Sequence, residues 1–388
     1  MVLFDKKEEC CGCSACKSIC PVSAIQMLPD DEGFLYPSID HSKCINCGKC
    51  KNMCAFQNGY DTDNNLKEPL VYAVRHKDIH EVATSRSGAM FIAVSDYILQ
   101  NNGVVYGVGY TDHFRVVHKR ATTKNERNEF KGSKYVQSDI NGTFELVKED
   151  LKNGLMVLFS GTPCQTAGLY SYLKNVNKEK LLVCDIVCHG VPSPFIWRDY
   201  LEYIEKKYKD KVIATDFRDK SSGWVSHVES FVLEKNNKKI KRSTFTDLFY
   251  KHIMLRPSCG ICKFTNFKRP SDITLADYWG WEKISSDFNS DNKGVSLVLL
   301  NSLKGQEFFQ IIKKDITSIP SSKDNCLQHN LQYPSRISPL REHFWKDYKK
   351  NGFKWVIKKY HDHKWVIKIR KKWGLAKAKL KRVISLQY

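Results

Sequence analysis

The sequence lacks the hydrophobic features that would tie it to a membrane or to export. No stretch approaches the roughly 18 consecutive apolar residues of a membrane-spanning helix, and the start, MVLFDKKEEC, has no apolar core of a signal peptide. No repeat of about 20 to 50 residues indicates a solenoid. Without a membrane span or a signal peptide, the expected location is the cytoplasm. Because 388 residues exceed what one hydrophobic core usually serves, we expect two or three domains.

Cysteine, in contrast, is abundant, with 15 residues in the chain. Reducing compartments keep thiols free, so a chain without an export signal does not use this many cysteines as a disulfide framework. We therefore expect most of the cysteines to bind metal.

Two four-cysteine runs lie in the first 54 residues: Cys10, Cys13, Cys16 and Cys20 before Pro21, then Cys44, Cys47, Cys50 and Cys54. In this spacing the first three cysteines of a run bind one [4Fe–4S] cluster and the fourth binds the other. The expected ligand sets are crossed: Cys10, Cys13, Cys16 and Cys54 for one cluster, and Cys20, Cys44, Cys47 and Cys50 for the other. A pair of zinc sites, the alternative, would need a simpler layout. Cys11 is out of register, and a hairpin is expected around the turn signal DDEGF at 30–34.

The chain after a polar linker at about 58–68 alternates short β-branched runs with helical patterns, which predicts a mixed α/β body. Expected strands are 71–74, 104–110, 155–160, 181–187, 212–217, 273–277 and 295–301. Expected helices are 89–100, 143–151, 165–173, 194–206 and 304–314. The fold class is thus an α+β, bacterial-type ferredoxin fold followed by an α/β body. Its expected parts are 1–60, 61–150, 151–335 and a basic tail at 336–388.

A second group of cysteines lies in this body: Cys164, Cys184, Cys188, Cys259 and Cys262. Cys164 and Cys188 each follow a predicted strand, and loops at strand ends converge on one edge of an α/β sheet. These two thiols can therefore meet the Cys259-x-x-Cys262 pair in a third [4Fe–4S] site. A zinc site around the pair, or buried structural cysteines, are the alternatives at this point.

The segments FSGTPCQ, CHGVPSPFIW, FRDKSSGW, LRPSCGICKF and SDITLADYWG resemble, in this order, the beta-subunit family of coenzyme F420-reducing hydrogenase and dehydrogenase. The resemblance runs from about residue 70 to 301. It implies FAD bound beside an iron–sulfur cluster, with Cys164, Cys188, Cys259 and Cys262 as ligands and Cys184 as a spare. Two departures concern cofactor contacts. Ala89 stands where the family usually has a second glycine after Ser87-Gly88, and this chain reads LADYWG where the family often has a glycine before the aspartate.

Two segments are candidates for binding the flavin. A helix N-terminus favours a pyrophosphate, and Ser87 and Gly88 precede a predicted helix. Ser133, Lys134 and Tyr135 follow Gly132 in a loop. By motif strength alone, an ordinary serine cap and a surface loop remain open.

Candidate catalytic residues are His189, which follows Cys188, and Lys220, which lies with Arg218 and Trp224 near a predicted strand end. A histidine there orients or protonates a flavin or substrate, or it only caps a turn. Asp277, at the end of its strand, is a candidate acceptor for a cofactor or a turn anchor.

Positive charge is concentrated at the end of the chain, where 346–388 carry 15 Lys and Arg against Asp347 and Asp362, a net +13. KWVIK occurs at 354–358 and 364–368, and the residues that follow place Trp365, Ile369 and Trp373 on one helical face. Such a helix suits an anionic membrane surface or an acidic partner, or it docks on the body. No reader motif accompanies the charge, so nucleic acid is not the expected partner.

These observations predict an iron–sulfur flavoprotein oxidoreductase that passes electrons between [4Fe–4S] clusters, FAD and a two-electron substrate. The resemblance implies coenzyme F420 or another soluble acceptor or donor as the substrate, with polysaccharide biosynthesis as one candidate setting. Expected partners are a redox protein or small-molecule electron carrier, with the tail at the inner face of the membrane. The alternatives are an electron-transfer subunit without its own substrate chemistry and a non-redox binding protein with structural clusters.

Overall fold

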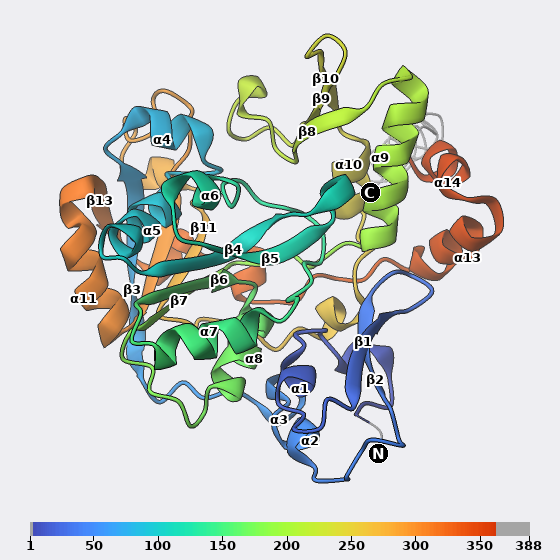
Figure 1. Cartoon of the computed structure of the whole chain (residues 1–388). Helices are drawn as coiled ribbons and strands as arrows, with labels where there is room; N and C mark the ends of the chain where they lie inside the picture. Colours follow the sequence, from blue (N-terminus) through green and yellow to red (C-terminus); the bar gives the residue numbers. More distant parts are fainter. Residues whose placement is uncertain (1–2, 362–388) are drawn as a thin grey trace, which may run out of the picture.

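The computed structural model describes residues 3–361 and shows a small N-terminal domain seated against a larger α/β body (Figure 1). The small domain contains α1 (Ala15–Ser18), β1 (Ile25–Pro29), β2 (Leu35–Ile39), α2 (Lys49–Asn52) and α3 (Ala55–Asn58). β1 and β2 pair antiparallel, which confirms the expected hairpin. Asp30 closes its turn, because its carboxylate accepts backbone hydrogen bonds from Glu32 and Phe34 at 3.0 and 2.9 Å.

One eight-stranded sheet organises the body in the order β13-β3-β12-β11-β7-β6-β4-β5. Its strands are β3 (Asn65–His76), β4 (Val104–Tyr110), β5 (Val116–Ala121), β6 (Val157–Gly161), β7 (Leu181–Ile186), β11 (Ile273–Asp277), β12 (Ser296–Ser302) and β13 (Ile316–Ser321). The central strands β4, β6, β7 and β11 are parallel, whereas the flanking pairs are antiparallel. Both expected halves, 61–150 and 151–335, contribute strands to this sheet.

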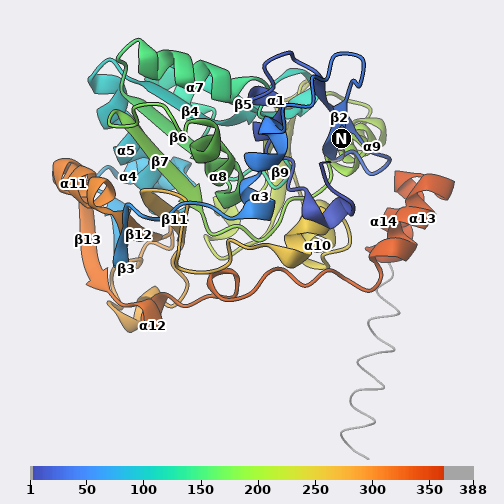
Figure 2. The same cartoon turned by 90° about the horizontal axis from the view of Figure 1, so that it is seen from below.

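Helices cover both faces of the sheet (Figure 2). One face packs on α7 (Thr143–Lys152) and α8 (Pro163–Tyr172), and the other on α5 (Met90–Gln100) and α11 (Leu303–Ile311). Shorter helices are α4 (Ile79–Thr84), α6 (Lys124–Asn128) and α12 (Lys323–Cys326). Buried runs of β-branched and aromatic residues in the parallel strands explain this two-sided burial.

A second core lies beside the sheet and the small domain (Figure 1). It is built from α9 (Pro194–Tyr208), α10 (Thr244–Tyr250), α13 (Arg341–Asn351), α14 (Phe353–Tyr360) and an antiparallel sheet of β8 (Val212–Asp216), β9 (Glu229–Leu233) and β10 (Lys239–Arg242). Val356 and Ile357, in the first KWVIK copy, are buried in this core. Up to residue 361 the basic segment is therefore docked on the body. The second copy and the helix predicted after it lie outside the described residues.

The remaining regular segments are single turns of 3-10 helix: η1 (Lys7–Glu9), η2 (Asp112–Phe114), η3 (Lys220–Ser222), η4 (Pro257–Ile261), η5 (Trp281–Lys283), η6 (Ile312–Asp315) and η7 (His329–Leu331). None of the helices within residues 3–361 has the length and apolar character needed to cross a bilayer. The expected linker is shorter than predicted, because β3 already begins at Asn65.

Candidate functional site: three cysteine sets and an adjoining cavity

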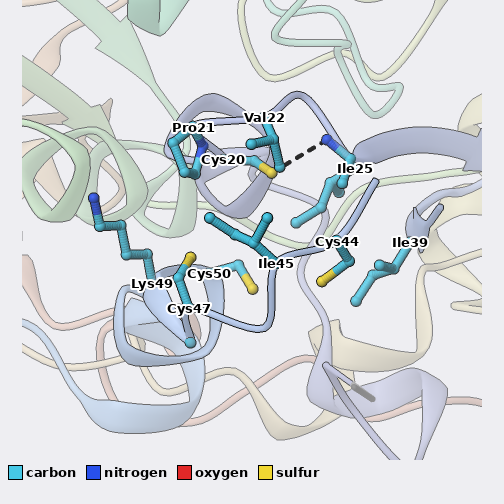
Figure 3. Close-up of a pocket in the computed structure, with 12 residues that line it drawn as sticks. Cys20, Pro21, Val22, Ile25, Ile39, Cys44, Ile45, Cys47, Lys49 and Cys50 are labelled. Atoms are coloured by element: carbon cyan, nitrogen blue, oxygen red, sulfur yellow. Dashed lines mark hydrogen bonds between the residues drawn. The ribbon is translucent and has the colours of Figure 1, made fainter. Parts of the chain in front are cut away.

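The outer cysteine set lines one small cavity of the N-terminal domain (Figure 3). Its four thiols are those of Cys20, Cys44, Cys47 and Cys50, the crossed combination expected from the spacing. The cavity has a volume of about 20 Å³, and apolar side chains such as Ile25 and Ile39 complete its wall. Cys47 is exposed. This set therefore lies at the molecular surface.

The inner set consists of Cys10, Cys13, Cys16 and Cys54, whose thiols are close enough to influence one another. Burial is the main cause that raises the pKa of Cys10, to about 11, and the neighbouring thiols raise it further. Backbone N–H groups point at all four sulfurs, including that of Gly12 at Cys10 and that of Gln57 at Cys54. Such N–H···S contacts are among the interactions that set the potential of an iron–sulfur cluster.

The two cysteine runs share a backbone conformation. Gly12 and Ser14 have φ of 71° and 65°, and Asn46 and Gly48, at the equivalent positions of the second run, have 53° and 73°. Left-handed residues at the same two offsets turn the chain in the same way around each set. A Cβ on Gly12 would lie 2.9 Å from Nη1 of Arg256, so this position needs glycine for space as well as conformation.

The third set contains Cys164, Cys188, Cys259 and Cys262, which the fold brings together from three loops. Cys164 lies in the first turn of α8 after β6, Cys188 follows β7, and Cys259 lies in η4. Their thiols interact mutually, since Cys188 is influenced by the other three. Gly190 and Val191 donate backbone hydrogen bonds to the sulfurs of Cys188 and Cys259, each at 3.4 Å. Four converging thiols with N–H donors fit a [4Fe–4S] cluster.

Cys184 stands apart from this set. It is fully buried in the sheet core, where burial raises its pKa well above the ordinary value. Within residues 3–361 no group of three or more His, Cys, Asp or Glu side chains is compact enough for a single metal ion. A [4Fe–4S] cluster needs more widely separated ligands than a single ion does, because each of its four cysteine sulfurs binds a different iron.

The inner and third sets adjoin along α8. Cys11 hydrogen-bonds the thiols of both Cys13 and Cys164, and this contact is the largest cause that lowers the pKa of Cys164 to about 7. Gly168, one turn after Cys164, is so close that a Cβ would lie 2.8 Å from Sγ of Cys13. The small domain therefore docks on α8 (Figure 2), and the out-of-register cysteine lies between the two sets.

A larger cavity of about 450 Å³ opens at the carboxyl ends of the parallel strands. Residues at the ends of β6, β7 and β11 line it, together with the first turn of α5. Cys188 belongs both to this wall and to the third cysteine set. The cavity thus lies directly beside the third set, at the sheet edge where α/β proteins bind ligands.

The turn before α5 forms one end of this cavity. Ser87 lines it, and its hydroxyl donates to the carbonyl of Val295 at 2.5 Å. Gly88 is not on the wall. It allows close packing instead, because a Cβ there would lie 2.1 Å from the carbonyl oxygen of Val74. Ser85 Oγ and Arg86 Nε are buried without a hydrogen-bond partner in the described chain. Unpaired donors beside a helix N-terminus fit a phosphate group.

Ser133, Lys134 and Tyr135 form another part of the cavity wall. Lys134 is committed to its own loop, since Nζ donates to the carbonyls of Glu129 and Lys131 at 2.5 and 3.0 Å. Burial lowers the pKa of Lys134 to about 7. The ring of Tyr135 stacks on Phe249 with centroids 5.1 Å apart. This part offers aromatic and hydroxyl surface more than free positive charge.

His189 lines the cavity as expected, and burial lowers its pKa, which favours the neutral imidazole near pH 7. Lys220 differs from the expectation. Lys220 is not on the cavity wall. Its Nζ donates to the carbonyls of Val82 and Ser87 at 2.7 and 3.2 Å, so it holds the turn before α5. Two backbone acceptors from another element fix this ammonium, which no sequence pattern indicated.

Two arginines beside the cavity pair with one carboxylate, that of Asp277. Asp277 lies 2.7 Å from Nη1 of Arg218 and 3.6 Å from Nη2 of Arg86. Both guanidinium groups also donate to the carbonyl of Trp224, whose ring is fully buried against Trp279. Arg86 directly precedes Ser87, one of the candidate flavin-binding residues.

His227, another residue that the sequence left unmarked, lines the same cavity. Burial, followed by the nearby charge of Arg218, lowers its pKa to about 4. It belongs to a loop before β9 and carries no motif that would have marked it.

Comparison with known proteins gives two family matches. Residues 9–58 match the 4Fe-4S dicluster domain, and residues 155–323 match the C terminus of the beta subunit of coenzyme F420 hydrogenase/dehydrogenase. No curated protein matches the chain. Among solved structures, a chain of the F420-reducing [NiFe] hydrogenase complex from Methanosarcina barkeri is similar at 16% identity and a TM-score of 0.46, over 77% of this chain and 93% of that chain.

Proposed function

Since residues 9–58 are a 4Fe-4S dicluster domain and residues 155–323 belong to the C-terminal family of coenzyme F420 hydrogenase/dehydrogenase beta subunits, we propose that this iron–sulfur protein is a flavoprotein oxidoreductase. Its cofactors are two [4Fe–4S] clusters in the N-terminal domain, a third at Cys164, Cys188, Cys259 and Cys262, and FAD in the cavity. When bound, the clusters supply one-electron transfer and the flavin supplies two-electron exchange with a soluble substrate.

One observation carries this proposal: Cys188 is shared between a set of four converging thiols and the wall of a 450 Å³ cavity. A cluster at these thiols and a ligand in the cavity would be neighbours without any intervening layer of protein. Three cysteine sets then form a continuous series from the exposed Cys47, through the inner set on α8, to the cavity.

The residues of the cavity have distinct tasks in this proposal. The N–H groups at the start of α5 and the unpaired hydroxyl of Ser85 bind a pyrophosphate. Ser87, which donates to the carbonyl of Val295, and Lys220 fix the turn that carries them. Asp277 holds Arg86 and Arg218 in place beside the ligand. His189, which lines the cavity, accepts a proton at one ring nitrogen or donates one from the other.

The substrate class proposed is coenzyme F420 or another soluble two-electron donor or acceptor, with polysaccharide biosynthesis as one setting. A redox partner protein or small-molecule carrier exchanges electrons at the N-terminal domain. We place the protein in the cytoplasm, because none of the 15 cysteines, all of which lie within the described residues, forms a disulfide, with the segment after residue 361 as a candidate membrane contact. An electron-transfer subunit without substrate chemistry is the second candidate, favoured by the relation to a hydrogenase subunit family. Turnover by the isolated chain would exclude it.

The test is anaerobic quantification of iron, sulfide and flavin in the purified chain and in a Cys259→Ala, Cys262→Ala variant. The proposal predicts about twelve irons and one FAD, falling to about eight irons in the variant. Cys184→Ala is the matched control, since this buried cysteine lies outside the third set. Eight irons in every protein and no flavin would contradict both the third cluster and the flavin assignment.

A further inference from the structure

Arg256 joins the body to the N-terminal domain from a fully buried position, with 0% of the residue exposed. Its guanidinium donates to the carbonyls of Cys10 at 2.9 Å and Leu35 at 3.0 Å, and to Oε1 of Gln137 at 2.8 Å. The ring of Tyr36 covers its flat face, with 4.1 Å between the guanidinium carbon and the ring centroid. Each of the three guanidinium nitrogens therefore donates to a partner in the described chain.

The charge of this arginine has an unusual counterpart. Within residues 3–361 no carboxylate forms an ion pair with Arg256, whereas Nη2 lies 3.7 Å from Sγ of Cys10. A buried charge is costly unless an opposite charge lies nearby. Arg256 also lies three residues before Cys259, whose backbone N–H donates to the carbonyl of Arg256 at 3.0 Å. The side chain of Arg256 thus contacts a sulfur of the inner set, and its backbone holds a cysteine of the third set.

We propose that Arg256 is a positioning residue for electron transfer: lying between the inner and the third cysteine sets, it raises the reduction potential of the clusters that they hold. Each reduction adds negative charge, which a fixed, buried cation stabilises. Net charge and hydrogen bonds to the sulfurs are established determinants of cluster potential. The effect on the third cluster rests on the proposed function, while the effect on the inner cluster rests on the dicluster domain.

The experiment is an anaerobic, EPR-monitored redox titration of the full-length protein with its clusters loaded. Arg256→Met removes the charge and keeps much of the volume, and Arg256→Lys keeps the charge but loses the planar fork. Arg341→Met, made together with Glu32→Gln so that no carboxylate loses its partner, is the matched control. Arg341 also joins the body to the N-terminal domain, but Glu32 neutralises its charge, with Nη1 at 3.1 Å from Oε1.

With iron content unchanged, we expect Arg256→Met to disfavour cluster reduction at least tenfold, a fall of 59 mV or more for a one-electron couple. Arg256→Lys should shift the potential less, and the Arg341→Met, Glu32→Gln control should leave it unchanged. Full iron content without a shift in Arg256→Met, or an equal shift in that control, would overturn the proposal.

If Arg256→Met loses its clusters, the titration is made on Arg256→Gln. This variant retains hydrogen-bond donors without charge and should show the same tenfold effect. Loss of iron in the Met, Gln and Lys variants alike would overturn the electrostatic role in favour of a purely structural one. Eight irons in the wild-type protein would refute the third cluster alone, and the shift of the inner cluster would still decide the role of Arg256.

Discussion

Replacing Asp277 by asparagine should destabilise the cavity wall more than any single surface ion pair would. Asp277→Asn keeps the shape of the side chain but removes the counter-charge of Arg218 and Arg86, whose side chains are only 3% and 12% exposed. Breaking a buried pair by removing one partner costs about 3 to 5 kcal/mol, because the remaining charge is left uncompensated. Since Asp277 itself is 13% exposed, we expect a loss near the lower figure, about 3 kcal/mol.

The assay is urea unfolding of the anaerobically loaded protein, followed by tryptophan fluorescence. Glu202→Gln is the control: Glu202 pairs with Lys206 at 3.1 Å, but the two side chains are 52% and 79% exposed, so its loss should cost no more than about 1 kcal/mol. Asp277→Asn should also weaken retention of flavin, because Arg86 and Arg218 flank the cavity. Equal losses of stability in the two variants would refute the reasoning.

Three further predictions concern the seat of the inner set, a buried histidine and the exposure of the outer set. Gly168→Leu should displace Cys13 and remove about four irons, as measured by iron analysis, because even a Cβ at this position would lie 2.8 Å from Sγ of Cys13; full iron content would show that the docking on α8 is more tolerant. Burial lowers the pKa of His118 to about 4. Below about pH 6.5 the histidine therefore binds a proton in the unfolded chain but not in the folded one, which destabilises the fold. The contribution of neutral His118 to stability is complete above about pH 6.5 and is lost as the pH falls toward 4, about 3 kcal/mol in all. Urea unfolding from pH 7 to 4 should show a shallower loss in His118→Gln, and an unchanged slope would contradict this assignment. Limited exposure to ferricyanide should remove the iron of the outer set first, because Cys47 is exposed whereas the inner set is covered by α8; EPR of the remaining cluster checks the order, and simultaneous loss would count against it.

Local patterns predicted most of the sheet, and the exceptions have physical causes. β4 and β11 have the expected bounds because their apolar runs are continuous and end at turn residues. β13 was missed since it is an edge strand that carries Pro320, a residue that usually argues against a strand. α10 was missed because its sequence, TFTDLFY, is rich in residues that favour strands, and burial in the second core decides its conformation.

The candidate site was predictable where ligands follow a fixed spacing or a strand end. The third set is such a case, since Cys164 and Cys188 follow neighbouring parallel strands. Spacing carries no information about contacts such as that of Arg256 with Cys10, which are 246 residues apart in sequence. The same limit explains Lys220, whose acceptors are the distant carbonyls of Val82 in α4 and Ser87 in the turn before α5.

The central claim is that a third cluster lies beside a flavin cavity, and the most direct test is iron and flavin stoichiometry in Cys188→Ala, the variant of the cysteine that the two sites share. The account predicts that iron falls from about twelve to about eight per chain while both N-terminal clusters keep their EPR signals. It also predicts that flavin remains bound, because the phosphate seat at α5 is untouched. An unchanged iron content, at eight or at twelve, would contradict the claim.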